Sequence, residues 1–272
     1  MNQRRVQRPV VVGAAVALLV VAGVVVVGVQ QRWWRAAPTV HLTCRPACPA
    51  MPTTVPAGYR VAFSDDFSHT ALNLRKWFVW AGQPGSDPSG WWVTPRRVER
   101  AGMLNLDGTV VASGGNPAWA HCGEITSGVG ARHVQVYGEY VWAMRSAASP
   151  GTSTIVLLWP KSNTWPPEID LYESDGNARK FTTTLHYGTA AHPVAVQSNA
   201  VGHDASAWHV YTAIWRPGAV QVLEDGAVVT SISSRHVPHV AMRLDIQTQA
   251  LHPRATAGST QIAWVVEYAP SG

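Results

Sequence analysis

The segment from Trp165 to Asp175, with the sequence WPPEIDLYESD, gathers carboxyl groups that could act together on one substrate. Alternate residues of a β-strand share one face, so Glu168 and Asp170 are expected to point the same way. Glu173 has the opposite parity and joins them only if a β-bulge inserts one extra residue, a device that re-aims side chains beside active sites. Carboxyl groups held this close cannot all ionise cheaply, so at least one pKa should rise. One carboxylate can then attack while another group donates a proton.

Two other interpretations of these acids fit the residues less well. A calcium loop spaces its acids among Gly, Asn and Asp rather than among Ile, Leu and Tyr. A solvated acidic strand would hardly bring its carboxyl groups together without basic partners. Glycoside hydrolysis uses two carboxyl groups, about 5–5.5 Å apart for retention of configuration and wider apart for inversion. A bulged strand is compatible with the shorter separation, so the segment predicts catalytic carboxyl groups.

Exposed aromatic side chains are the second requirement of a carbohydrate site, because sugar rings stack on aromatic faces. The chain contains 13 Trp, more than ordinary core packing needs. Trp165 lies three residues before Glu168 and is the first candidate for contact with a sugar. Loops tend to carry binding residues, and three more tryptophans lie in segments rich in Gly, Pro and Ser. These further candidates are Trp91, Trp92 and Trp119.

Polar residues on the expected strands complete the predicted binding site. His186 follows the acids on a strand-like run and is expected to contact the substrate or Glu173. Gln249 shares a strand face with Gln247 and is expected to line the far side of the cleft. No metal site is predicted, because the remaining histidines are scattered and lack a third ligand at a suitable spacing.

The elements that must position these residues are short β-strands. From Gly58 onward no apolar period of 3.6 residues runs for more than two turns, and alternating or β-branched runs recur instead. The Asp225-Gly226 pair is a hairpin turn signal. This pattern predicts an all-β fold, a two-sheet sandwich or jelly roll. The expected strands lie within residues 137–145, 154–159, 181–187, 209–215, 220–224, 227–232, 242–249 and 261–268.

Residues 9–29 form an uncharged apolar run, and a helix crosses a bilayer with ~20 such residues. Three arginines precede the run and two follow it, so the positive-inside rule places residues 1–8 in the cytoplasm and the rest of the chain outside. We therefore expect a single-pass protein of the cell membrane. The alternative is a signal peptide cleaved near Ala36-Ala37, which leaves a secreted protein. Residues 30–57, with five prolines, predict a linker, and residues 58–270 predict the folded domain.

Charge and cysteine content limit the partners of the folded domain. Five of the 21 Lys and Arg lie in the first 35 residues, which hold no acid, so the remaining chain has equal numbers of basic and acidic residues. A nucleic-acid partner is therefore excluded. Contact with a membrane is expected only through residues 9–29, and the protein is expected to be a monomer. The chain has three cysteines, Cys44, Cys48 and Cys122. Because an odd number leaves one cysteine without a partner, the sequence assigns no disulfide.

The segment from Glu168 to Glu173, EIDLYE, resembles the E-x-D-x-x-E signature of glycoside hydrolase family 16 in its bulged, laminarinase-like form. Other segments agree with that family in the same order, and the resemblance extends from Gly58 to about Tyr268. The matching segments are residues 63–67 (FSDDF), 72–77, 124–127 (EITS), 137–140 (YGEY), 185–188 (LHYG), 208–217, 224–226 (EDG) and 262–268 (IAWVVEY).

The resemblance implies a concanavalin-like β-jelly roll with a carbohydrate cleft across its concave sheet. It also implies retaining hydrolysis of internal β-linkages in a polysaccharide. On the matching positions Glu168 would be the nucleophile and Glu173 the general acid/base. Asp170 would control the charge of the nucleophile through a shared hydrogen bond. We expect an endo-β-1,3-glucanase-like enzyme that needs no cofactor.

Several alternatives stay open at this point. Mixed-linkage glucan or galactan cleavage and transglycosylation belong to the same family, whereas a non-catalytic glycan-binding sandwich or a structural envelope protein would keep only the fold. Some relatives hold calcium through an Asp just before the aromatic residue of the last strand, but Ala263 stands at that position here, so no calcium is expected. The family's W-L-x-P strand reads LLWP at residues 157–160, which moves Trp159 two residues along the same face.

Overall fold

The computed structural model describes residues 48–69, 71–80, 90–92, 97–98, 102–110, 124–147, 149–251 and 256–272. The chain divides into two compact units, residues 1–41 and 42–272, and the first lies wholly outside the described residues. The expectations for the tail at 1–8, the apolar run at 9–29 and the linker up to residue 47 therefore fall outside them too. Within the described ranges no helix is long and apolar enough to span a membrane.

The described residues fold into β-strands joined by turns and loops, as the alternating sequence pattern predicts. The strands are β1 (Tyr59–Asp65), β2 (Trp77–Val79), β3 (Gly90–Trp92), β4 (Arg97–Val98), β5 (Leu104–Val110), β6 (Glu124–Ala131), β7 (Gly138–Ala147), β8 (Thr152–Pro160), β9 (Glu168–Glu173), β10 (Lys180–Thr189), β11 (His192–Val201), β12 (His209–Arg216), β13 (Ala219–Glu224), β14 (Ala227–Ser233), β15 (Met242–Ala250) and β16 (Gly258–Pro270).

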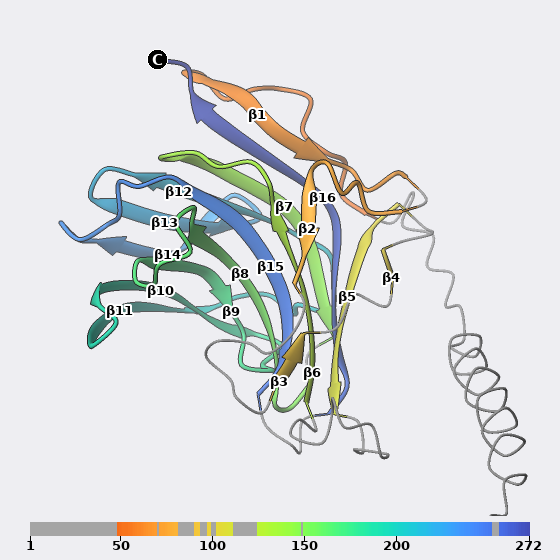
Figure 1. Cartoon of the computed structure of the whole chain (residues 1–272). Coiled ribbons are helices and arrows are strands. Elements are labelled where there is room, and N and C mark those ends of the chain that lie inside the picture. The colour runs from red at the N-terminus through yellow and green to blue at the C-terminus, as the bar shows by residue number, and fades with distance from the viewer. Residues whose placement is uncertain are drawn as a thin grey trace, which may run out of the picture. The chain divides into compact units, whose positions relative to one another are not determined.

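The strands form two layers, and Figure 1 shows β8 beside β15 in one and β7 beside β16 in the other. The first sheet has the order β11-β10-β9-β8-β15-β6-β2, and the second has the order β5-β16-β7-β12-β13-β14, with β1 on β16 and β4 on β5. Pairing between β5 and β6 links the two sheets. All pairs are antiparallel except β3 with β6. The predicted all-β, two-sheet sandwich is confirmed.

The main hydrophobic core lies between the sheets and takes alternate residues from the strands, because successive side chains point to opposite faces. Tyr140, Trp142 and Met144 of β7 belong to this core, and Leu244 and Ile246 of β15 also belong to it. Each large apolar side chain buried in this way contributes roughly 1.5–3 kcal/mol to stability. The alternation leaves the second face of β9, β8 and β15 free to carry polar side chains.

The second sheet is also covered on its other face. A smaller cluster there contains Trp264 and Tyr268 of β16, and Cys48 packs against it. The Trp264 Nε1–H donates to the carbonyl of Pro49 at 2.8 Å, and the Tyr268 hydroxyl donates to the carbonyl of Thr54 at 3.4 Å. Part of the predicted linker, residues 48–57, therefore lies against β16.

Cys48 forms a disulfide. Its partner is either Cys44 or Cys122, the two other cysteines of the chain, and both lie outside the described residues.

Candidate active site

Strand β9 contains the bulge that the parity of its acids requires. On its β8 side, Tyr172 pairs with Val156 and Asp170 pairs with Leu157, so two positions of β8 face three positions of β9. The extra residue is Leu171. On the β10 side the register shifts at the same place, because Thr182 pairs with Glu173 and Thr184 pairs with Asp170. The predicted bulge is confirmed.

The bulge reverses the facing of the residues that follow it. Leu171 and Tyr172 are neighbours in sequence, yet both belong to the core between the sheets. Tyr172 stacks on Phe181 with ring centroids 4.4 Å apart, which fixes its ring on the core side. Glu173 therefore returns to the outer face of the first sheet, where it interacts electrostatically with Asp170 and Glu168. Three carboxyl groups share this face.

Two neighbouring side chains hold the carboxyl groups in place. The Trp165 Nε1–H donates to Glu168 Oε2 at 2.7 Å, and His186 Nε2 lies 3.0 Å from Asp170 Oδ2. His186 pairs with Glu168 in the register of β10 and β9, and its ring lies 5.8 Å from the Trp165 ring. Trp165, Glu168, Asp170 and His186 therefore form one connected group on the outer face.

Burial and mutual repulsion change the acidity of the group. Burial, followed by the charge of Asp170, raises the pKa of Glu168 to about 8, against the opposing effects of the Trp165 hydrogen bond and of His186. Burial and then the charges of Asp170 and Asp175 raise the pKa of Glu173 to about 7. The hydrogen bond to Asp170 raises the pKa of His186. The expectation of a raised carboxyl pKa is confirmed, so the group retains a proton near neutral pH.

This arrangement can supply a nucleophile and an acid to the same bond. The Trp165 N–H favours the carboxylate form of Glu168, which suits attack on an electrophilic carbon. Ionisation of one glutamate raises the pKa of the other, because their charges repel. The pair thus favours a state with one carboxylate and one protonated carboxyl group, as nucleophilic catalysis with general acid assistance requires.

Ligand atoms of Glu168, Asp170 and His186 lie within 4.8 Å of one another, a spacing that a metal ion could also use. The two hydrogen bonds of this group, from Trp165 to Glu168 and between His186 and Asp170, give these polar atoms protein partners. The sequence reasoning did not consider His186 together with these two acids as ligands, and the absence of a metal from this site stays a prediction.

Of the other four predicted binding residues, the structure describes the side chain of Gln249 alone. Trp91 and Trp92 lie on β3, but their side chains lie outside the described part of the structure, as does the whole of Trp119. Gln249 is half-buried on β15 and pairs with Ser153 of β8. Strand β8 lies between β15 and β9, so Gln249 is two strands away from the acids in the sheet. By alternation Gln249 is on the outer face of the first sheet.

The sequence reasoning missed a charged pair on the same face. Arg243 donates from Nε to Asp245 Oδ1 at 3.2 Å, and its guanidinium lies 5.0 Å from the Phe78 ring and 5.3 Å from the Trp80 ring. Both charged side chains are buried. In the sheet register Asp245 pairs with Leu157, which pairs with Asp170, so Asp245 belongs to the same row of side chains as Asp170. The alternation Arg243-Leu-Asp245-Ile in the sequence was the available signal.

A two-layer β-sandwich with three carboxyl groups on a bulged strand defines a protein of the sandwich-fold glycoside hydrolase type. The chain belongs to glycosyl hydrolases family 16, whose family model matches residues 58–266. The resemblance of the E-x-D-x-x-E segment to that family is thus confirmed over most of the folded unit.

Two curated relatives come from Rhizobium meliloti. The endo-1,3-1,4-beta-glycanase ExsH is 24% identical over 193 residues, and the endo-1,3-1,4-beta-glycanase EglC is 25% identical over 191 residues. Each match covers 61% of this chain and 41% of the relative, so the chain spans less than half the length of either protein.

Solved structures share the fold at low identity. LamA from Zobellia galactanivorans, in complex with laminaritriose and laminaritetraose, superposes with a TM-score of 0.64 at 16% identity and covers 77% of this chain and 98% of its own. The laminarinase catalytic domain of Thermotoga maritima superposes with a TM-score of 0.64 at 13% identity, over 79% of this chain and 99% of its own. These likenesses establish the jelly-roll fold.

Proposed function

We propose that this protein is a retaining endo-β-glycosidase that hydrolyses internal linkages of a polysaccharide, with β-1,3-glucan as its substrate. The observation that carries the proposal is the Leu171 bulge, which brings Glu168, Asp170 and Glu173 to one face of β9. The raised pKa values of Glu168, about 8, and of Glu173, about 7, keep a proton on this pair of glutamates near neutral pH, and departure of a sugar hydroxyl needs that proton.

The reaction is a double displacement in which each glutamate has one role. The Glu168 carboxylate attacks the anomeric carbon while Glu173 transfers its proton to the departing glycosidic oxygen. The glycan is then bound covalently as a glycosyl ester of Glu168. Glu173, now ionised, takes a proton from water as that water attacks the same carbon and releases Glu168. Two inversions give net retention. Trp165 positions Glu168 through its hydrogen bond, and the charge of Asp170 raises the pKa of Glu168.

The substrate class is supported by the relatives and by the bulged form of the strand. Two of the proteins similar to this chain are named as endo-1,3-1,4-beta-glycanases, and a structural neighbour was solved with laminari-oligosaccharides. We therefore place β-1,3-glucan first and mixed-linkage glucan second.

The proposal is tested with the purified full chain on laminarin, lichenan and agarose. New reducing ends, with oligosaccharides rather than monosaccharides as early products, are expected first on laminarin. Proton NMR of the earliest products should show the β-anomer. Binding of laminarin without turnover would instead indicate a glycan-binding sandwich, and longer oligosaccharides formed at high sugar concentration would indicate transglycosylation.

Replacing Asp170 with asparagine should move the pH–activity profile to lower pH. The charge of Asp170 raises the pKa of both Glu168 and Glu173, so its loss lowers both values. Activity requires one ionised and one protonated glutamate, and both limbs of the bell-shaped profile follow these groups. The ratio of variant to wild-type kcat/KM should therefore fall as pH rises from about 7 to about 8, the range in which the two glutamates titrate.

The matched control is Asp175→Asn, at an exposed position whose charge also raises the pKa of Glu173. This variant should move the alkaline limb alone and by less than Asp170→Asn, because Asp170 is the larger of the two electrostatic causes. Identical profiles for Asp170→Asn and the wild type would contradict the proposed coupling.

Replacing Trp165 with phenylalanine should lower kcat about tenfold or more, because a hydrogen bond to a charged group contributes about 1.5–3 kcal/mol. The variant keeps an aromatic ring but loses the N–H that donates to Glu168. The pKa of Glu168 should then rise further, and the acidic limb of the profile should move to higher pH. Trp208→Phe is the control, since Trp208 packs on the second sheet. Equal kinetics for the two variants would exclude a positioning role for Trp165.

We further propose that the enzyme is a monomer that acts outside the cell membrane, anchored by residues 9–29. The uncharged run and the three preceding arginines support the anchor. In cells that produce the full chain, the domain should be digested by protease added to intact cells and should stay in the membrane fraction at high pH. A soluble extracellular form whose N-terminus follows Ala37 would support cleavage instead.

A further inference from the structure

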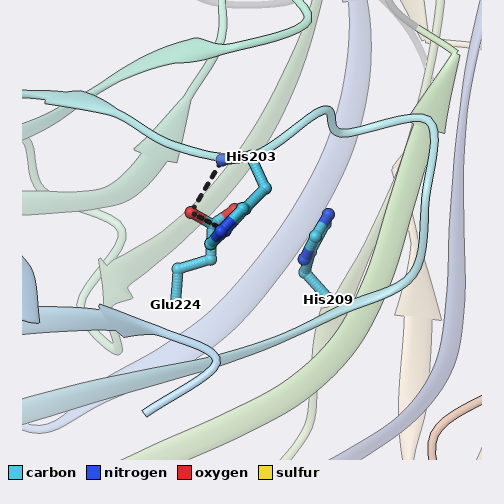
Figure 2. A group of neighbouring side chains, drawn as sticks. All are labelled: His203, His209 and Glu224. Carbon is cyan, nitrogen blue, oxygen red and sulfur yellow. Dashed lines mark hydrogen bonds and ion pairs between the residues drawn. The ribbon is translucent and has the colours of Figure 1, made fainter. Parts of the chain in front are cut away.

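A histidine–carboxylate cluster lies where the chain crosses from the first sheet to the second. We define it as His203, His209, Glu224 and Asp225; Figure 2 shows the first three. His203 belongs to the connection between β11 and β12, and His209 is the first residue of β12. Glu224 ends β13, and Asp225 lies in the turn before β14. The cluster therefore joins a crossover connection to a hairpin turn.

The ligand-type atoms of the cluster converge. Glu224 Oε2 lies 3.3 Å from His203 Nδ1, and Asp225 Oδ2 lies 4.0 Å from the same nitrogen and 2.7 Å from His209 Nδ1. Ligand atoms of His203, His209 and Glu224 all lie within 4.8 Å of one another. Ligands of a tetrahedral ion at about 2.0–2.1 Å stand about 3.3 Å apart, so the atoms of these three residues lie near the spacing that one ion needs, and Asp225 Oδ2 lies beside both histidines.

The environment of His209 favours a cation at its Nδ1. Its Nε2 lies 3.1 Å from the backbone carbonyl of Asp204, and its Nδ1 lies 2.7 Å from the Asp225 carboxylate. Both neighbours are acceptors, whereas a neutral imidazole has a single N–H. A ring that donates from Nε2 to a carbonyl and presents Nδ1 to a cation is the usual arrangement of a metal-bound histidine.

The carboxylates of the cluster need a positive charge and are already oriented. Glu224 is 1% exposed, and among the residues that the structure describes no Lys or Arg forms an ion pair with Glu224 or Asp225. The Tyr211 hydroxyl donates to Glu224 Oε1 at 3.0 Å, and the Val210 N–H donates to Asp225 Oδ1 at 2.9 Å. The other oxygen of Glu224, Oε2, accepts from the His203 backbone N–H at 3.0 Å and lies beside the His203 ring, and Asp225 Oδ2 lies beside both histidines.

We propose that His203, His209, Glu224 and Asp225 bind one divalent transition-metal ion of the zinc type. Two imidazole nitrogens and two carboxylate oxygens suit such an ion, whereas calcium and magnesium take oxygen ligands throughout. The ion ties the β11–β12 crossover to the β13–β14 turn. It stabilises the folded chain because it binds the folded state alone. The site is separate from the β9 acids and does not depend on the proposed hydrolysis.

The test uses the full chain without a histidine tag, stripped with chelator and titrated with zinc sulfate. Calorimetry should give one ion per chain, and zinc should raise the thermal midpoint while calcium does not. His203→Ala removes an exposed ligand and should weaken binding at least tenfold, and Asp225→Asn should do the same at nearly constant shape. His192→Ala removes an exposed histidine of β11 outside the cluster and should bind zinc as the wild type does.

Two outcomes would overturn the proposal. One is the absence of zinc binding and of a thermal shift in the wild-type chain. The other is unchanged zinc binding by His203→Ala together with loss of binding by His186→Ala, which would place the ion at Glu168, Asp170 and His186. Cobalt(II) gives an independent readout, since visible absorption of a four-coordinate ion should appear in the wild type and in His192→Ala but not in His203→Ala.

Discussion

Replacing Glu168 with glutamine is expected to lower kcat/KM on laminarin by on the order of 10⁴-fold or more, because the amide cannot form the glycosyl ester. Glutamine keeps the shape of the side chain and can still meet the Trp165 N–H through its carbonyl oxygen. Binding of the polysaccharide should persist, since the change removes a carboxylate and no stacking surface. Reducing-end assays over long incubations, with affinity electrophoresis for binding, measure both quantities.

The matched control for this prediction is Glu139→Gln. Glu139 is a half-buried glutamate of β7 in the second sheet, hydrogen-bonded to Tyr59 rather than to the β9 group. It should retain nearly full activity. If Glu168→Gln kept more than a tenth of wild-type turnover while folded, Glu168 would not be the nucleophile.

The sequence predicted the centre of the site because its geometry is local. The parity of Glu168, Asp170 and Glu173 demands one extra residue, and the only elements needed are β9 and its two neighbours. Trp165 was found for the same reason, since three residues separate it from the acid that it contacts. His186 was found because the next strand in sequence is also the next strand in the sheet.

The sequence could not predict contacts that depend on sheet order. Arg243 meets Phe78 and Trp80 because β15 and β2 are both neighbours of β6, although about 160 residues separate them in the chain. The histidine–carboxylate cluster likewise needs the register of β12 against β13, in which Tyr211 pairs with Glu224. Residues 48–57 pack against β16 because the outer face of that strand carries apolar side chains that they cover. The Pro-rich composition of residues 48–57 does not reveal this contact.

Replacing Glu173 with glutamine should produce a loss that depends on the leaving group. On laminarin, where a poor leaving oxygen needs a proton, kcat/KM should fall by about 10²–10⁴-fold. On an aryl β-laminaribioside whose phenolate leaves without a proton, formation of the glycosyl ester should stay fast. Hydrolysis of that ester should become slow, because no base activates the water. The expected signature is a burst of phenolate equal to the enzyme concentration, followed by slow turnover.

Added azide separates this role from a general loss of structure. Azide attacks the glycosyl ester of Glu168 without giving up a proton, so it should restore turnover of the aryl substrate by Glu173→Gln and yield the β-glycosyl azide. Glu168→Gln forms no ester and should show neither burst nor β-azide. The alkaline limb of the pH profile, which follows loss of the last proton from the glutamate pair, should also disappear in Glu173→Gln on the aryl substrate. Equal losses of activity on laminarin and on the aryl substrate, with no effect of azide, would show that Glu173 is not the acid/base. Glu173 would then act only through its electrostatic interaction with Asp170.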